Sequence, residues 1–347
     1  MPDSSPIRAA VIGYGLSGRI FHAPFLAADE RFSIEAISTG DPARQARAAE
    51  DHPGAVIYGS PEELLAHSFD LVVLGSPAHV HLEQGLAALA SGAALVVDKP
   101  FATSVAEAEQ LIAAAAAAGR PLIVFQNRRW DGDFLTLRKL LAEGALGRVH
   151  RFESTFERWS PEVRPRWQDT TTTSQGAGIV FDLGSHLVDQ ALHLLGPASL
   201  VAAELSILRP GAVSADEAFL SLLHDSGTRS HLTMSRYATQ AGPRFLVLGS
   251  AAGYVVYGLD PQEHALVAGG RPGDADFGVA PVAAWGTLGT DSSASSPVPL
   301  ATERGDYAAF YAGVAAAIRD GAPPPVDPSD SLAALRIIAQ AHEIAGI

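Results

Sequence analysis

The stretch Val11-Ile12-Gly13-Tyr14-Gly15-Leu16-Ser17-Gly18-Arg19 decides the fold of this chain. The apolar segment 7–12 predicts a strand that runs directly into the pattern G-x-G-x-x-G, and a helical pattern follows. Gly13 permits the tight turn from strand to helix, Gly15 lets the backbone approach a pyrophosphate, and Gly18 lets the helix pack against the strand. The N–H groups at the start of such a helix attract phosphates. The stretch therefore predicts a dinucleotide-binding turn, not a plain glycine-rich turn between core elements.

Length and composition predict a two-domain protein. The chain has 347 residues, and domains commonly contain about 150 residues. No apolar run approaches the ~20 residues that a membrane span needs. The N-terminus has no basic, signal-like segment, so we expect a cytoplasmic protein with no membrane partner. The absence of cysteine excludes disulfides, thiolate catalysis and Cys-ligated zinc, and it fits a reducing compartment.

The acidic balance argues against a nucleic-acid partner. The formal net charge is −14, from 24 basic and 38 acidic residues, whereas a nucleic-acid binder normally carries a basic face. The tightest basic group is Arg128-Arg129 beside Trp130, which suits an ion pair or an anion contact better than a duplex.

Residues 1–125 alternate strand and helix patterns, which predicts a parallel sheet with helices on both faces and a first domain with these bounds. Ser17, Ser60 and Ser104 occupy positions that suit helix N-caps, and Gly92 and Gly119 follow helical runs. The expected strands are 7–12, 33–38, 70–74, 94–97 and 122–125, and the expected helices are 17–28, 42–51, 61–66, 79–90 and 104–118.

The regular alternation of strand and helix patterns ends after Gln126, so we place a second domain at 126–347. Several strand patterns there follow one another without helices, which predicts a mostly antiparallel sheet. Segment 269–299, rich in Gly, Ser, Pro and Asp, predicts a long surface loop. The expected strands are 149–156, 200–208, 218–224, 229–234, 244–249 and 253–257, and the expected helices are 130–142, 183–195, 307–319 and 329–344.

The end of the second strand bears on the choice of nucleotide. An acidic residue there would hydrogen-bond the ribose of NAD, but Thr39 occupies that position. Ser38 and Thr39 can donate hydrogen bonds to a 2′-phosphate, and Arg44 can supply positive charge. Asp41 can turn toward the ribose, but before Pro42 it is typical of a helix N-cap. We therefore expect NADP, with NAD as the alternative.

Two further stretches carry chemistry. Lys99 follows the apolar segment 94–97, at the strand end where open α/β sheets bind ligands, although it can also be a surface lysine paired with Asp98. Asp182 and His186 are four residues apart and would share one face of a helix. A carboxylate beside a histidine can orient it for proton transfer. The alternatives are an N-cap role for Asp182 and a buried structural role for His186.

The stretch around His186 gives little support for a metal site. His186 with Asp189 or His193 has a generic spacing, and no third ligand is evident. We therefore predict no metal.

Four features occur together and in order: G-x-G-x-x-G at 13–18, Asp98-Lys99-Pro100, the stretch Asn127-Arg128-Arg129-Trp130-Asp131, and the stretch Asp182-Leu183-Gly184-Ser185-His186. With them the chain resembles, nearly end to end, the glucose–fructose oxidoreductase / inositol dehydrogenase / MocA family. It is most similar to the NADP-dependent scyllo-inositol dehydrogenase branch in 15–24, 127–135, 158–167 and 182–196.

The resemblance implies a Rossmann domain, then an α/β domain with a large open sheet that often mediates oligomerisation, and hence a homodimer or homotetramer. It implies that Lys99 contacts the reacting hydroxyl and the nicotinamide ribose, and that Asp182 and His186 are the catalytic aspartate and histidine. The family signature is usually Glu-Lys-Pro, so the shorter Asp98 puts its own contribution in doubt.

We thus expect an NAD(P)-dependent dehydrogenase that acts on a secondary alcohol of a polyol or sugar. A catalytically silent NADP-binding regulator, imine reduction and glycoside cleavage through transient oxidation are the alternatives, because fold alone does not specify function. An acidic sugar also stays open as substrate. The expected cofactor-binding residues are Gly13, Tyr14, Gly15, Ser17, Gly18, Arg19, Ser38, Thr39, Arg44, Ser76, Pro77, His79 and Lys99. The expected substrate-binding residues are Asn127, Arg128, Arg158, Arg166 and Trp167.

Overall fold

The computed structural model describes residues 5–291 and 296–346, and the chain divides into two compact units. The first comprises Met1–Asn127, Gln262–Phe277 and Tyr307–Leu332, and the second comprises Arg128–Pro261, Gly278–Asp306 and Ala333–Ile347. The first unit therefore contains the predicted Rossmann segment together with two later segments of the chain. Across the described ranges, no helix has both the length and the apolar character that a membrane crossing requires.

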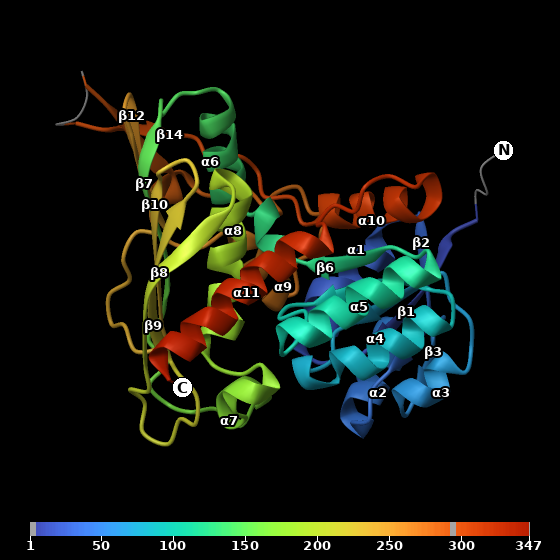
Figure 1. Cartoon of the computed structure of the whole chain (residues 1–347). Coiled ribbons are helices and arrows are strands. Elements are labelled where there is room, and N and C mark those ends of the chain that lie inside the picture. Colours follow the sequence, from blue (N-terminus) through green and yellow to red (C-terminus); the bar gives the residue numbers. More distant parts are fainter. Residues whose placement is uncertain (1–4, 292–295, 347) are drawn as a thin grey trace. The chain divides into compact units, whose positions relative to one another are not determined.

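The first unit is built on a six-stranded parallel sheet in the order β3-β2-β1-β4-β5-β6 (Figure 1). The neighbours β1 and β4 mark the point where the strand order reverses, and open α/β sheets bind ligands at such a point. The inner strands are almost wholly buried, as expected when helices cover both faces of a sheet. The strands are β1 (Ile7–Ile12), β2 (Phe32–Ser38), β3 (Val56–Tyr58), β4 (Leu71–Leu74), β5 (Ala94–Asp98) and β6 (Leu122–Phe125).

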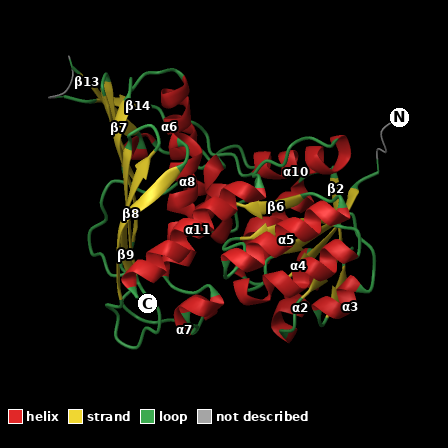
Figure 2. Ribbon diagram, in the orientation of Figure 1, coloured by secondary structure: helices red, strands yellow, loops and turns green. Residues whose placement is uncertain are grey.

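Helices connect these strands, and α4 and α5 pack side by side (Figure 2). Ser104 caps α5 by accepting a hydrogen bond from the N–H of Glu107 at 3.3 Å. The helical elements are η1 (Ser17–His22), α1 (Ala23–Ala28), α2 (Pro42–Asp51), α3 (Pro61–Leu65), η2 (Ala78–Val80), α4 (His81–Ala90), α5 (Val105–Ala118), α9 (Pro261–Val267) and α10 (Ala308–Asp320).

The second unit contains an eight-stranded mixed sheet in the order β14-β13-β12-β11-β7-β10-β9-β8. Its neighbours pair antiparallel except for the parallel pair β7 and β10. The predicted fold class is therefore confirmed. The strands are β7 (Val149–Glu157), β8 (Ala198–Ser206), β9 (Glu217–His224), β10 (Arg229–Ser235), β11 (Phe245–Gly249), β12 (Ala252–Val256), β13 (Gly286–Thr290) and β14 (Val298–Leu300).

Helices cover one face of this sheet. Every second residue is buried in β9, in β10 and in β7 from Phe152 on, as in Phe152, Ser154 and Phe156, and helix α8 packs on this side. The helical elements are η3 (Asn127–Trp130), α6 (Gly132–Ala142), α7 (Trp167–Thr170), η4 (Thr173–Gln175), η5 (Val180–Gly184), α8 (Ser185–Leu195), η6 (Val282–Ala284) and α11 (Pro328–Ala345), of which η3 and α11 span the division between the units.

Three local predictions were wrong. Segment 269–299 contains η6, β13 and the start of β14, because glycines and threonines pair there at the sheet edge; its residues 292–295 lie outside the described residues. Strand β3 and helix α9 were missed because both are short. Ser17 does not cap its helix: Leu16 precedes η1 with helical dihedral angles, and no side chain caps it.

Candidate functional site

The glycine turn of the first unit is a close approach of two backbone segments. Gly13 has a positive φ of 91°, and a Cβ on it would lie 2.8 Å from the carbonyl carbon of Gly75. A Cβ on Gly18 would lie 1.9 Å from the carbonyl oxygen of Gly13. No larger side chain fits at these two positions. The two glycines therefore let the turn pack closely against the segment that follows β4, the strand-to-helix geometry that suits a phosphate group.

Two buried hydroxyl groups at this strand edge favour a ligand. Among the described residues, the Oγ atoms of Ser17 and Ser38 are buried and have no hydrogen-bond partner. Buried hydroxyls in native proteins are nearly always paired, so these two are available to a polar ligand or to water. Ser17 follows the glycine turn, and Ser38 ends β2. Their placement fits a nucleotide that lies along this edge.

The start of α2 supplies a positive charge next to the turn. Asp41 caps the helix, since its Oδ1 accepts hydrogen bonds from the N–H groups of Ala43 and Arg44 at 2.9 and 3.0 Å. The Nη1 atom of Arg44 lies 3.7 Å from the position of a Cβ on Gly15. Asp41 is therefore engaged as a cap, while a guanidinium lies beside the turn, and this arrangement suits a phosphate better than a bare ribose.

The other expected cofactor residues of the first unit are distributed around these groups. Tyr14 is buried and donates its hydroxyl proton to Asp51 at 3.0 Å, so only its backbone faces the turn. Thr39 is buried and follows β2, whereas Arg19 is exposed on η1. Pro77 precedes η2, and His79 is exposed on it.

His81, which the sequence analysis missed, joins two strand ends of this unit. Its Nε2 lies 2.9 Å from the carbonyl oxygen of Ser76, after β4, and its Nδ1 lies 3.1 Å from that of Pro100, after β5. Burial lowers the pKa of this imidazole. Between Asp98 and Pro100 lies Lys99, whose N–H donates to Asp98 Oδ1 at 2.7 Å. His81 therefore fixes the backbone at Pro100, directly after the candidate residue Lys99.

In the second unit, Asp182 and His186 lie on one continuous helical segment. Asp182 belongs to the π-helical turn η5, and His186 is in the first turn of α8, where it is 4% exposed. Gly184 between them lets the segment approach β10, because a Cβ there would lie 2.9 Å from the sulfur of Met234. The Oδ2 atom of Asp182 forms an ion pair with Nη2 of Arg236.

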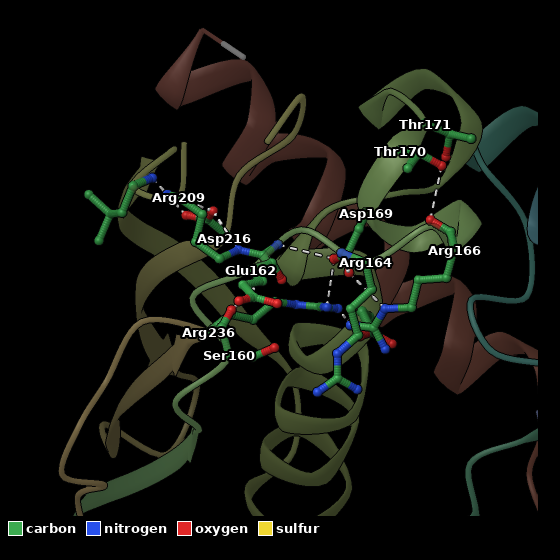
Figure 3. A network of polar contacts seen from close by, with 12 residues as sticks. Ser160, Glu162, Arg164, Arg166, Asp169, Thr170, Thr171, Arg209, Asp216 and Arg236 are labelled. Atoms are coloured by element: carbon green, nitrogen blue, oxygen red, sulfur yellow. Dashed lines mark hydrogen bonds and ion pairs between the residues drawn. The ribbon is translucent and has the colours of Figure 1, made fainter. Parts of the chain in front are cut away.

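Arg236 is part of a buried ionic network that is drawn in Figure 3. Its Nη1 donates to Asp169 Oδ1 at 2.8 Å, and Arg209 Nη2 donates to the same oxygen at 3.0 Å. Arg209 also donates from Nε to Asp216 Oδ2 at 2.9 Å. The sequence carries no local motif for these four residues, because each partner comes from a different segment.

The expected substrate residues fall into two groups. The guanidinium carbons of Arg128 and Arg158 lie 4.8 and 5.2 Å from the centroid of the Phe156 ring, so the structure brings these two arginines together. Arg166 instead donates from Nε to Asp169 Oδ2 at 2.8 Å and thus joins the ionic network. Trp167 begins α7 next to it. Asn127, which is buried, belongs to the first unit.

A second buried network fixes helix α8. Gln190 donates from Nε2 to the carbonyl oxygen of Arg128 at 2.8 Å and accepts from Arg244 Nη2 at 2.5 Å. Arg129 pairs with both carboxylate oxygens of Asp189, so these oxygens are committed to the guanidinium and do not suit a metal. Burial raises the pKa of Asp133, near Arg244, to about 6. No cluster of three metal-ligating side chains occurs within 5–291 and 296–346.

Comparison with known proteins agrees with this architecture. Residues 7–126 match the profile of an oxidoreductase family with an NAD-binding Rossmann fold, and residues 134–255 match the GFO/IDH/MocA C-terminal domain. These matches and the fold define an oxidoreductase with a nicotinamide-nucleotide-binding domain. The chain belongs to the glucose–fructose oxidoreductase / inositol dehydrogenase / MocA family, which confirms the resemblance.

Three relatives extend over nearly the whole chain. The uncharacterized oxidoreductase YdgJ of Escherichia coli (strain K12) is 38% identical over 96% of this chain and 95% of its own length. The scyllo-inositol 2-dehydrogenase (NADP(+)) IolW of Bacillus subtilis (strain 168) is 34% identical over 97% of this chain and 93% of its own. The solved structure of YvaA from Bacillus subtilis superposes with a TM-score of 0.94 at 32% identity and covers 100% of this chain and 98% of that one.

Proposed function

We propose that this protein is an NADP-dependent dehydrogenase that oxidises a secondary alcohol of a cyclitol or sugar of the scyllo-inositol type. The observation that carries the proposal is that Asp182 and His186 lie on one helical segment. The buried Arg236, which follows β10, forms an ion pair with Asp182. The 34% identity to IolW, a scyllo-inositol 2-dehydrogenase that uses NADP(+), supports both the substrate class and the nucleotide.

The first unit would hold the nucleotide through groups described above. The turn at Gly13 and Gly15 would contact the pyrophosphate, the hydroxyls of Ser17 and Ser38 would donate to phosphate or ribose oxygens, and Arg44 would pair with a 2′-phosphate. A bound nicotinamide supplies the acceptor for the hydride of an alcohol.

The chain's own residues handle the proton and the developing charge. We expect His186 to remove the hydroxyl proton during oxidation and to return it during reduction, because an imidazole nitrogen can both accept and donate a proton. Lys99 would stabilise the developing alkoxide with its positive charge. Asp182 would hold the imidazole and part of the substrate in orientation.

The second unit carries groups suited to a polyol. Arg128 and Arg158 beside Phe156, together with Arg166 and Trp167, combine hydrogen-bond donors with apolar ring surface. A polyol needs many such donors in a small space, and the buried pairing of Arg128 with Asp131 at 3.3 Å would limit its rotation. We assign these four residues to substrate recognition.

A homodimer or homotetramer is part of the proposal, on the basis of family resemblance and the open eight-stranded sheet. Light scattering of the purified protein after size exclusion tests it, and a monomer at micromolar concentration would contradict it.

The first experiment measures nicotinamide reduction with NADP and NAD in parallel across inositols, aldoses and aldonic acids. Turnover of an inositol with a preference for NADP supports the proposal. Turnover of an aldose alone keeps the mechanism and changes the substrate. Tight NADPH binding without turnover of any compound contradicts the enzymatic proposal and favours a regulatory protein.

A further inference from the structure

The ionic network of Asp216, Arg209, Asp169 and Arg236, labelled in Figure 3, continues through Arg236 to the proposed catalytic aspartate, Asp182. Five side chains alternate in charge along it: Asp216, Arg209, Asp169, Arg236 and Asp182. The first four are at most 3% exposed, whereas the Asp182 side chain is 18% exposed. Asp182 is therefore the accessible end of an otherwise buried chain of charges.

The guanidinium of Arg236 is held from several directions. Its residue directly follows β10, its N–H donates to the carbonyl oxygen of Asp216 at 2.9 Å, and its carbonyl oxygen accepts from the N–H of Ser160 at 2.8 Å. The side chain then spans from Asp169 to Asp182 with separate nitrogens, Nη1 and Nη2. A planar guanidinium whose two Nη atoms each bind a carboxylate has little rotational freedom. Arg236 therefore restricts the orientation of the Asp182 carboxylate.

The positive charge of Arg236 lies between the carboxylates of Asp169 and Asp182. Asp169 is shared by three guanidiniums, those of Arg166, Arg209 and Arg236. Asp216 pairs with Arg209, so the four buried members of the network carry two charges of each sign. The Nη2 atom of Arg236 is directed at Asp182, and an adjacent positive charge favours the carboxylate form of an aspartate.

We propose that Arg236, braced by Asp169, is a positioning residue that sets the orientation and the negative charge of Asp182 for the dehydrogenase reaction. This inference rests on the proposed function, because it assumes that Asp182 serves the reaction. Arg236 acts through Asp182.

The test compares R236M with R209M. Both substitutions remove a buried guanidinium that binds Asp169, but only Arg236 also binds Asp182. We expect R236M to lower kcat about tenfold or more, since a misplaced group near the reacting atoms loses much of its effect. The KM for NADP should stay unchanged. R209M should destabilise the fold to a similar degree and keep kcat within about twofold of wild type.

R236K tests rescue by charge. Lysine keeps the positive charge but cannot bridge two carboxylates in a fixed plane, so kcat should recover only in part. If R236M does not fold, D169N is tested in its place. D169N removes the carboxylate charge that pairs with Arg236 but retains Arg236 itself, so we expect an intermediate loss of kcat.

A readout that is independent of turnover is the ¹³C resonance of the Asp182 carboxyl group, assigned with D182N. Loss of the neighbouring positive charge favours protonation, so the resonance should begin to titrate at higher pH in R236M than in wild type and R209M. Parallel losses of kcat in R236M and R209M with no change in this titration would overturn the inference. If wild type oxidises no alcohol, the proposed function fails, and the titration alone decides whether Arg236 controls Asp182.

Discussion

Arg129 and Asp189 form a two-point ion pair inside the second unit, with Nη2 2.6 Å from Oδ1 and Nε 2.8 Å from Oδ2. The two side chains are 4% and 2% exposed. Asp189 follows His186 by three residues on α8, whereas Arg129 belongs to η3. The pair therefore ties the helix that carries the proposed catalytic histidine to a segment 60 residues earlier in the chain.

Removal of one partner should destabilise the protein strongly. We expect Asp189→Asn to lower the free energy of unfolding by about 3–5 kcal/mol, because it leaves a buried guanidinium without its counter-charge. Urea unfolding followed by circular dichroism measures the change. The control is Glu303→Gln, which breaks the exposed pair with Lys139 and should have a far smaller effect. Equal effects of the two substitutions would contradict the structural role of the buried pair.

His186→Ala should remove most of the catalytic activity and leave the nucleotide site intact. Loss of a general acid–base group typically lowers kcat by about 10²- to 10⁴-fold. Steady-state kinetics measures the loss, and the quenching of protein fluorescence by NADPH reports the affinity for the nucleotide. A parallel loss of NADPH binding would argue against a role of His186 in proton transfer.

Arg44→Ala should change the nucleotide preference. A guanidinium that pairs with a phosphate contributes about 1.5–3 kcal/mol, so we expect the affinity for NADP to fall about tenfold or more. The affinity for NAD should change little. The matched control is Arg47→Ala on the same helix, since Arg47 pairs with Glu50 at 3.3 Å. The assignment of NADP fails if Arg44→Ala weakens NAD and NADP binding equally.

His22 should make the folded state sensitive to mild acid. It is buried, its Nδ1 lies 2.7 Å from the hydroxyl oxygen of Tyr311, and burial lowers its pKa from 6.5 to about 4; nearby Asp98 opposes this shift and His81 adds to it. The unfolded chain binds the proton more readily, so this contribution to stability is complete above about pH 6.5 and decreases as the pH falls toward about 4.

Between about pH 7 and about pH 5 the loss attributable to His22 should be about 2 kcal/mol. We expect His22→Asn to lose less stability than wild type over this interval, although it starts from a lower value at neutral pH. Urea unfolding at both pH values measures the difference. Identical pH dependence in the two proteins would show that His22 is not the responsible group.

Much of the first unit could be predicted from the sequence. Helix α2 and strands β1 and β6 have the predicted bounds, because apolar runs, N-caps and glycines act over a few residues. The glycine turn was predictable for the same reason: its three glycines are specified by contacts within one strand–turn–helix unit and its nearest neighbour. The Asp41 cap was likewise readable as a local signal.

The sequence by itself determined the alternation of strands and helices, the nucleotide-binding turn and the family to which the chain belongs. Only the tertiary structure decided that Arg236, Asp169 and Asp182 form one ionic network, and that His81 joins two strand ends. Periodicity and capping depend on neighbours in the chain. The ion pairs of this network join residues as much as 67 positions apart, and they depend on which segments become adjacent, which no local pattern records.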